Sequence, residues 1–183
     1  MIKQTLEFLT EEVAFGLGLD ISDVSLDNLI NLQENNAQGL IISLLNVEQE
    51  STLKNSPHFI RKNNRVVYKE PPVFLNMNIL MAFEFDDYGT SLQRLGDTVE
   101  FFQSRRMFSI ANQRPENPFP QGVEKLILEL QQLNFEQLNH IWSISGGSQF
   151  PSLLYKVRLV KIQPQDETEG PEIDTIQLDS GVM

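Results

Sequence analysis

A chain of 183 residues, 40% of them apolar, is predicted to form one domain with a substantial hydrophobic core. The sequence has no cysteine, which excludes disulfide bonds and thiolate chemistry, and its two histidines are too few for a histidine-rich metal site. The formal net charge of −11 argues against a nucleic-acid partner, because counterion release on a nucleic acid needs a basic protein face.

The sequence predicts no membrane-spanning segment, because no apolar run approaches the roughly 20 residues that cross a bilayer. Residues 1–10 also lack the cleavage pattern of a signal peptide. We therefore expect no direct insertion into a membrane.

The first element is predicted to be an amphipathic helix. Its apolar stripe consists of Ile2, Leu6, Leu9 and Val13. Gly16 and Gly18 offer left-handed caps that end this helix. Residues 20–34 fit neither the helical nor the strand period. Residues 40–47 then form an apolar run of strand length, which is typical of a central strand buried on both faces.

A β-hairpin is predicted next, because apolar residues 59–60 and 66–68 flank a polar turn at Asn63 and Asn64. The hairpin tip is basic, with Arg61, Lys62 and Arg65. Two interpretations stay open, since the tip can meet an acidic partner surface or can simply be solvated.

Residues 73–85 predict the central strand, because seven apolar side chains alternate along this stretch. They are Val73, Leu75, Met77, Ile79, Met81, Phe83 and Phe85. The opposite face is more polar, because Asn76, Asn78 and Glu84 point to it. This second face is therefore a candidate contact face for a neighbouring molecule.

A helix is predicted to follow Asp87 and to cover the central strand. Its apolar positions at helical spacing are Leu92, Leu95, Val99 and Phe102. Arg105 and Arg106 stand at the end of this helix, where positive charge complements the helix dipole. Contact of these arginines with carboxylates of a partner is the alternative interpretation.

The proline-rich residues 112–122 predict a loop. Residues 123–133 stay ambiguous, because their apolar positions fit both a helical stripe and a strand. Asn134 is predicted to cap a helix over residues 135–142, and residues 153–162 alternate as a final strand.

Residues 163–183, the acidic tail, carry six acidic residues and no basic one, which predicts a flexible segment. The tail nevertheless contains the apolar residues Ile173, Ile176 and Leu178. A tail that adds a strand to a neighbouring subunit is therefore the alternative. The predicted organisation is one domain over residues 1–162 followed by this flexible or subunit-bridging tail.

The sequence contains no recognisable catalytic constellation. Neither histidine stands in a triad context, and a metal or ligand site built from Asp86, Asp87 and His140 would need the fold to bring distant segments together. We therefore expect no enzyme activity, no cofactor and no metal site.

Five strings, taken in order, resemble the cap or tail-terminator proteins of bacterial contractile injection systems, which are phage-tail-like particles. They are residues 42–55 (ISLLNVEQESTLKN), 71–78 (PPVFLNMN), 101–104 (FFQS), 135–142 (FEQLNHIW) and 151–158 (PSLLYKVR). The resemblance covers roughly residues 1–162. It implies an α+β fold in which helices pack on a mixed β-sheet, and it favours a strand over residues 123–131.

The resemblance further implies a structural cap that closes the baseplate-distal end of the sheath and inner tube as a homohexameric ring. Sheath and inner-tube proteins are the implied partners, and the bacterial cytoplasm is the implied place of assembly into a particle that is released or membrane-anchored. Two alternatives remain: an adaptor that links the particle end to another component such as a membrane anchor, and a small-molecule-binding or metal-dependent enzyme.

The first candidates for subunit or sheath contacts are the polar residues that follow the strand at 40–47. They are Glu48, Glu50, Lys54 and Asn55. The alternative for this segment is an intramolecular cap of the strand end. Further interface candidates are the basic hairpin tip and the three apolar residues of the acidic tail.

Overall fold

The computed structural model describes residues 1–34, 38–50, 59–62, 65–69, 73–162 and 167–169. The helices are α1 (Ile2–Leu17), α2 (Leu29–Glu34), α3 (Tyr88–Ser104) and α4 (Phe135–Ile144), with the short 3-10 helices η1 (Ile21–Asp23) and η2 (Ile110–Asn112). The strands are β1 (Val24–Leu26), β2 (Gly39–Gln49), β3 (Phe59–Lys62), β4 (Arg65–Lys69), β5 (Val73–Glu84), β6 (Met107–Ser109), β7 (Lys125–Gln131), β8 (Ser152–Ile162) and β9 (Glu167–Glu169).

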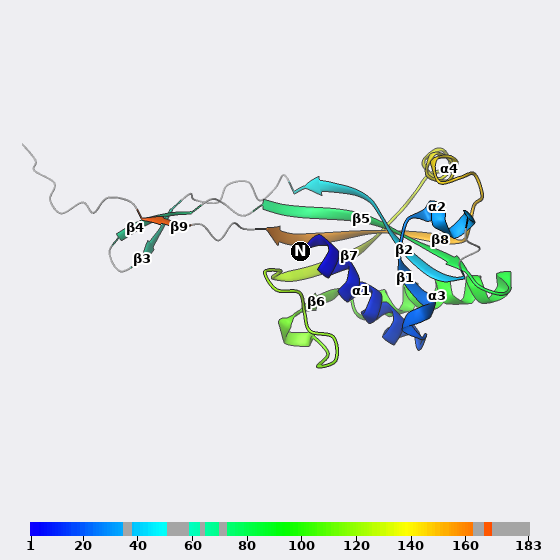
Figure 1. Ribbon diagram of the computed structural model, residues 1–183, viewed down its shortest axis with the longest axis horizontal. Coiled ribbons are helices and arrows are strands. Elements are labelled where there is room, and N and C mark those ends of the chain that lie inside the picture. Colours follow the sequence, from blue (N-terminus) through cyan, green and yellow to red (C-terminus); the bar gives the residue numbers. More distant parts are fainter. Residues whose placement is uncertain (35–37, 51–58, 63–64, 70–72, 163–166, 170–183) are drawn as a thin grey trace, which may run out of the picture.

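One mixed sheet holds six of these strands in the order β1-β2-β5-β8-β7-β6. Strand β1 runs parallel to β2, and the other neighbouring pairs are antiparallel. Helices pack against this sheet (Figure 1), so the predicted α+β class with a mixed sheet is confirmed. The predicted central strand is confirmed as well, because β5 lies between β2 and β8. The ambiguous segment forms strand β7, as the resemblance implied.

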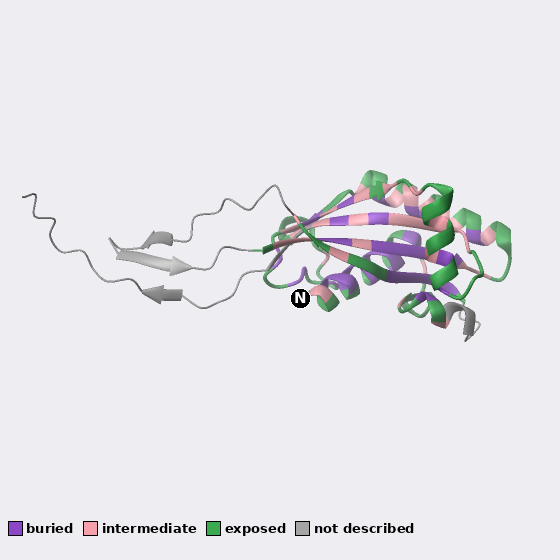
Figure 2. Cartoon of the chain, turned by 90° about the horizontal axis from the view of Figure 1, so that it is seen from above, coloured by how far each residue is buried: buried purple, intermediate pink, exposed green. Residues whose placement is uncertain are grey.

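The larger core lies between one face of the sheet and helices α1 and α3, and the strands of the sheet carry many of the buried residues drawn in purple in Figure 2. Its members include Leu6, Leu9, Val13, Leu40, Ile42, Met77, Ile79, Met81, Phe83, Phe102, Phe108, Leu126 and Val157. Burying a side chain of this size contributes about 1.5–3 kcal/mol relative to leaving it exposed. The alternating residues predicted to share one face of β5 therefore supply the centre of this core.

The second face of the sheet is covered at one end by α2 and α4. A smaller core forms there from Leu29, Ile41, Leu80, Ala82 and Trp142. Strand β5 is consequently buried on both faces over residues 80–83. Nearer its first residue, the second face of β5 carries Asn76 and Asn78, as its sequence pattern predicted.

Strand β2 is buried on both faces only in its first half. Leu40, Ile41 and Ile42 are at most 1% exposed, whereas Leu44 and Leu45 are each 37% exposed. The pairing register with β5 shifts between Leu44 and Asn46. Such an irregularity redirects the side chains of a strand, and it lies where the burial of β2 ends. The prediction of a fully buried strand is therefore wrong for the second half of β2.

Helix α3 packs through a stripe that matches the predicted one only in part, because Phe102 is buried and Leu95 packs against the larger core as predicted. Its buried residues are Ser91, Thr98 and Phe102, while Leu92 is 46% exposed. The Ser91 and Thr98 hydroxyl groups donate hydrogen bonds to the backbone carbonyls of Asp87 and Arg94, so these polar side chains are satisfied inside the helix. Because helical spacing leaves rotation about the helix axis open, the sequence could not show which stripe is buried.

Two of the predicted helix ends are confirmed and one is wrong. Gly18 is the C-cap of α1 with a left-handed φ of 61°, and Asn134 caps α4 in a reciprocal capping box with Gln137. Gly16, by contrast, lies inside α1. A Cβ atom at Gly16 would lie 2.4 Å from the Phe101 ring, so this glycine permits the close approach of α1 to α3.

A buried carboxylate ties α1 to the segment that follows α3. Glu12 is fully buried and accepts hydrogen bonds from Arg105 Nη1 at 2.6 Å, Arg114 Nε at 2.8 Å and Asn117 Nδ2 at 2.9 Å. The two guanidinium groups neutralise the carboxylate, which a buried charge requires. Arg105 therefore serves as an ion-pair partner in the structure.

A smaller sheet contains β3, β4 and β9. The predicted hairpin is confirmed by the antiparallel pairing of β3 with β4. Strand β9 belongs to the acidic tail and pairs with β4 of the same chain, which the sequence did not predict. In the large sheet, Gln49 pairs with Leu75 and Val73 with Ile162. The hairpin and the tail therefore both leave the large sheet at one end, as can be followed in Figure 1.

Candidate interaction surface

Polar side chains on four adjacent strands, or directly after one of them, form two hydrogen-bonded groups on the second face of the sheet. We name this set the polar sheet face. It consists of Glu48, Glu50, Asn76, Asn78, Glu129, Lys156 and Arg158. The strand order β2-β5-β8-β7 brings these residues together from four separate parts of the sequence.

Glu48 joins the residues of the first group. It accepts hydrogen bonds from Lys156 Nζ at 3.2 Å and Asn78 Nδ2 at 3.0 Å. The hydrogen bond from Lys156, followed by the positive charge of this lysine, lowers the pKa of the Glu48 carboxyl below its ordinary value of 4.5. Glu48 therefore stays ionised in the folded protein at neutral pH.

Arg158 links the other two carboxylates of the polar sheet face. Its Nη2 atom lies 3.3 Å from Glu50 Oε2, and its Nη1 atom lies 3.0 Å from Glu129 Oε1. Glu50 also accepts a hydrogen bond from Asn76 Nδ2 at 3.0 Å. Hydrogen bonding to Glu129, followed by the charge of Glu129, raises the pKa of Arg158. The Arg158–Glu129 pair is diagonal on the neighbouring strands β8 and β7, within the reach of long side chains. The Arg158–Glu50 pair instead reaches across β5.

The polar sheet face thus carries three carboxylates that are paired with two cations. Glu48 and Glu50 make contacts within their own chain, in line with the alternative that this segment caps the strand end. The Glu48 side chain nevertheless remains 45% exposed, so its contact with a neighbouring subunit stays a prediction. Lys156, Arg158 and Glu129 were not selected from the sequence, because their meeting depends on strand register between distant segments.

Helix α4 presents two large apolar side chains to solvent. Phe135 is 91% exposed at the first residue of the helix, and Ile144 is 81% exposed at the last. Ile144 also lines an open hollow of about 520 Å³ together with Leu44 and Leu45 of β2. A group of exposed apolar side chains, such as Ile144, Leu44 and Leu45, is typical of protein contact surfaces. The sequence did not predict them, because Phe135 and Ile144 fit an ordinary amphipathic helix.

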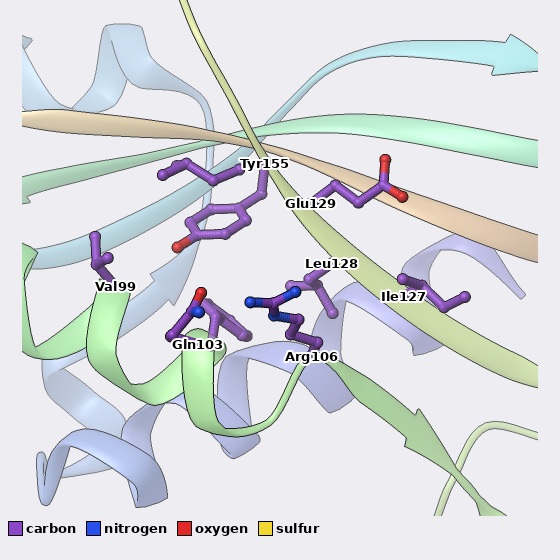
Figure 3. Close-up of a pocket in the computed structure, with 9 residues that line it drawn as sticks. Val99, Gln103, Arg106, Ile127, Leu128, Glu129 and Tyr155 are labelled. Carbon is purple, nitrogen blue, oxygen red and sulfur yellow. The ribbon is translucent and has the colours of Figure 1, made fainter.

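A cavity of about 370 Å³ lies between α3 and β7. Figure 3 shows Gln103, Arg106 and Tyr155 pointing into this space from the helix, the loop that follows it and the sheet. Phe102, Leu128 and Val99 supply apolar walls. Burial raises the pKa of Tyr155 to about 12, so its hydroxyl group is neutral at physiological pH. We name this space the α3–β7 cavity.

The other predicted interface residues lie in the hairpin strands or outside the described segments. Arg61 and Lys62 lie in β3 and Arg65 in β4, where the strand pairing is described. Residues outside the described segments are Lys54, Asn55, Ile173, Ile176 and Leu178. All eight therefore remain predictions.

The fold does not bring the residues of the alternative metal or ligand site together. Asp87 is the N-cap of α3, which packs in the larger core, whereas His140 is exposed on α4, which packs on the opposite sheet face. Asp86 directly precedes Asp87 and shares its position. Within the described residues, no group of three His, Asp or Glu side chains is placed to hold a metal ion.

None of the helices in the described segments has both the length and the apolar character needed to cross a bilayer.

The fold is similar to that of two solved proteins of contractile particles. The first is the sheath/tube terminator, in its extended state, of an extracellular contractile injection system named PVC, with a TM-score of 0.66 and 13% sequence identity. The match covers 100% of this chain and 65% of that chain. The second is the tube-terminating cap of the anti-feeding prophage, with a TM-score of 0.68 and 12% identity. This match covers 94% of this chain and 58% of that chain.

The chain therefore spans about three fifths of the length of these two structures. Comparison with curated proteins gives no match. The model of the Pvc16 N-terminal domain family matches residues 3–175. Because this match covers nearly all of the sequence, the chain belongs to the Pvc16 N-terminal domain family.

Proposed function

We propose that this chain is a structural cap that closes the baseplate-distal end of the sheath and inner tube of a contractile injection particle. The observation that carries the proposal is the fold likeness of the whole chain to a sheath/tube terminator, together with its membership of the Pvc16 N-terminal domain family. A terminator works by shape complementarity on one side, since its other side must not accept another tube layer.

The proposed assembly is a homohexameric ring. A heterologous contact that repeats around a symmetry axis closes a ring and matches the sixfold end of a tube. The exposed apolar side chains of α4 and the nearby hollow lined by Leu44 and Leu45 support a subunit contact on this side of the molecule. The basic hairpin residues Arg61, Lys62 and Arg65 are proposed to meet an acidic partner surface.

The role is proposed to be structural and not enzymatic. In this proposal the protein contacts sheath and inner-tube proteins and binds neither nucleic acid nor a membrane directly. It assembles in the bacterial cytoplasm and remains a component of the injection particle. The acidic tail is proposed to bridge neighbouring subunits through Ile173, Ile176 and Leu178, and Lys54 and Asn55 are proposed to contribute beside it.

Negative-stain electron microscopy of the purified protein tests the proposed ring. We expect particles with a central opening and sixfold symmetry in class averages. A protein that stays monomeric at high concentration, also when mixed with tube protein, would contradict the cap.

A charge swap tests the proposed contact of Glu48 with a neighbour. Glu48→Lys should leave a folded monomer and lose rings, whereas Glu50 is unsuitable for reversal because its side chain is only 10% exposed. Glu48→Lys combined with Lys156→Glu keeps the intramolecular pair but reverses both charges. If this double variant regains rings, Glu48 acts only within the subunit, and its proposed interface role is wrong. Far-ultraviolet circular dichroism checks that both variants are folded.

A further inference from the structure

The second half of β7 forms an open edge of the large sheet. Strand β6 pairs with β7 only as far as Ile127, and the Leu128 amide then donates to the Arg106 carbonyl at 2.9 Å. No described strand continues this pairing beside residues 129–131. Because backbone direction alternates along a strand, the Leu130 amide faces the same open side as that of Leu128. An open edge of this kind is a template for one more strand.

The α3–β7 cavity lies directly beneath this edge. Leu130 is 49% exposed and lines the cavity beside Leu128, so the edge and the cavity form one continuous surface. Within the described part of the chain, the Arg106 guanidinium has no ion-pair or hydrogen-bond partner, in contrast to Arg105, which pairs with Glu12. The Tyr155 hydroxyl likewise has no hydrogen-bond partner among the described residues.

The chemistry of this surface specifies its ligand. The apolar walls formed by Val99, Phe102 and Leu128 fit an aliphatic side chain, and the unpaired Arg106 fits a carboxylate. Glu129 also lines the cavity, but it is already paired with Arg158 on the other side of the sheet. The ligand is therefore an extended segment in which aliphatic and acidic side chains share one face.

The acidic tail contains such a segment. Asp174, Ile176 and Leu178 are two residues apart in the sequence. In an extended strand their side chains therefore point to one face, at a spacing of about 7 Å. The tail carries no basic residue that would compete with Arg106.

We propose that residues 173–179 of one subunit add a strand to the open edge of β7 in a neighbouring subunit. Ile176 and Leu178 then occupy the α3–β7 cavity, and Asp174 pairs with Arg106. This inference rests on the proposed ring and names the site that receives the tail. Because donor and acceptor surfaces differ, the contact is heterologous and repeats around the ring.

The direction of β8 favours a neighbour over the same subunit as the donor. Tyr155 of β8 lines the cavity, and the strand then runs away from it for seven residues to Ile162, a distance of about 23 Å. Beyond β8 in the sequence, strand β9 pairs with β4 in the smaller sheet. Strand β8 thus ends remote from the cavity of its own subunit, which favours the cavity of a neighbour as the receiver of the tail.

Disulfide trapping tests the inference cleanly, because the full chain has no native cysteine. Chains with Gln103→Cys, on the cavity wall, are mixed with affinity-tagged chains with Leu178→Cys and oxidised under ring-forming conditions. We expect a disulfide-linked heterodimer on non-reducing gels. The matched control replaces the Gln103→Cys chains with Phe135→Cys chains. Phe135 is 91% exposed on α4, which packs on the opposite sheet face. The control mixture should give about tenfold less heterodimer.

Charge exchange tests the predicted ion pair. Arg106→Glu in the Gln103→Cys chain should reduce the heterodimer about tenfold, and adding Asp174→Arg to the tagged chain should restore it. Rings without the disulfide, or a disulfide unaffected by Arg106→Glu, would overturn this inference while the ring stands. If unmodified chains form no rings and no heterodimer appears, the proposed function fails as well. A full chain carrying both cysteines that gives only an intrachain disulfide would overturn the choice of a neighbouring subunit.

Discussion

At the residue scale, Glu12 fixes helix α1 to the segment that follows α3. Its carboxylate is fully buried and holds Arg105, Arg114 and Asn117 against α1. Removal of one partner from such a cluster leaves the others desolvated and unpaired, which is the costly way to break a buried ion pair.

Glu12→Gln is expected to lower the free energy of unfolding by about 3 kcal/mol. This value is near the low end of the cost of breaking a buried ion pair, because the side chains of Arg105 and Arg114 remain 24% and 18% exposed. Urea denaturation measures this change. Glu7→Gln on the same helix is the matched control, since Glu7 pairs with the exposed Lys3 at the surface and this substitution should cost less than about 1 kcal/mol. Equal effects of the two substitutions would contradict the anchoring role of Glu12.

Glu48 gives the polar sheet face a predictable pH dependence. Its folded-state pKa lies below the ordinary value of 4.5, mainly because of Lys156. Its contribution to stability is therefore fully present above pH 4.5 and is lost as the pH falls through the folded-state pKa. The stability difference between the native chain and Glu48→Gln should then be measurable at neutral pH and shrink on acidification. A difference that stays constant in urea titrations across this range would show that the carboxylate charge is not involved.

At the scale of elements, the contact between α1 and α3 depends on the absence of a side chain at Gly16. Alanine is ordinarily favoured over glycine inside a helix by about 1 kcal/mol. At Gly16, however, a Cβ atom would overlap the Phe101 ring, and overpacking costs about 1–3 kcal/mol.

Gly16→Ala is therefore expected to lower the melting temperature, in spite of its higher helix propensity. Gly96→Ala on α3 provides the control, because a Cβ atom there meets nothing within 4 Å. This second variant should be stabilised by about 1 kcal/mol. Thermal unfolding followed by circular dichroism distinguishes the two, and stabilisation of both variants would contradict the close packing of α1 on α3.

Most elements could be predicted from the sequence, because their signals are local. The alternation along β5, the cap at Asn134 and the turn between β3 and β4 each depend on neighbouring residues. The rotation of α3 could not be predicted, since its buried stripe includes Ser91 and Thr98, whose hydroxyl groups bond to the helix backbone.

The candidate surface was only partly predictable for a related reason. The sequence indicated Glu48, Glu50, Asn76 and Asn78 as polar residues near strand ends or on a second sheet face. Their partners Lys156 and Arg158 come from β8, and the pairing register that joins these strands is not encoded in any local pattern. The α3–β7 cavity likewise depends on how far β6 extends beside β7.

At the scale of the whole molecule, the two sheet faces have different roles. One is closed by the larger core, and the other is divided between the smaller core and the polar sheet face. The hairpin and the acidic tail leave the large sheet together at one end. A subunit with one closed face, one partly polar face and extensions at one end suits a contact that differs on its two sides, as a ring that terminates a tube requires.

The most direct test of the proposed cap is cryo-electron microscopy of assembled particles that carry a tagged copy of this chain. We predict label at one end of each particle, opposite the baseplate, as a single sixfold ring on the tube and sheath. Particles made without the chain should have tubes of uncontrolled length or unsealed ends. Label spread along the sheath or located at the baseplate, or particles of unchanged length and closed ends without the chain, would contradict the proposed function.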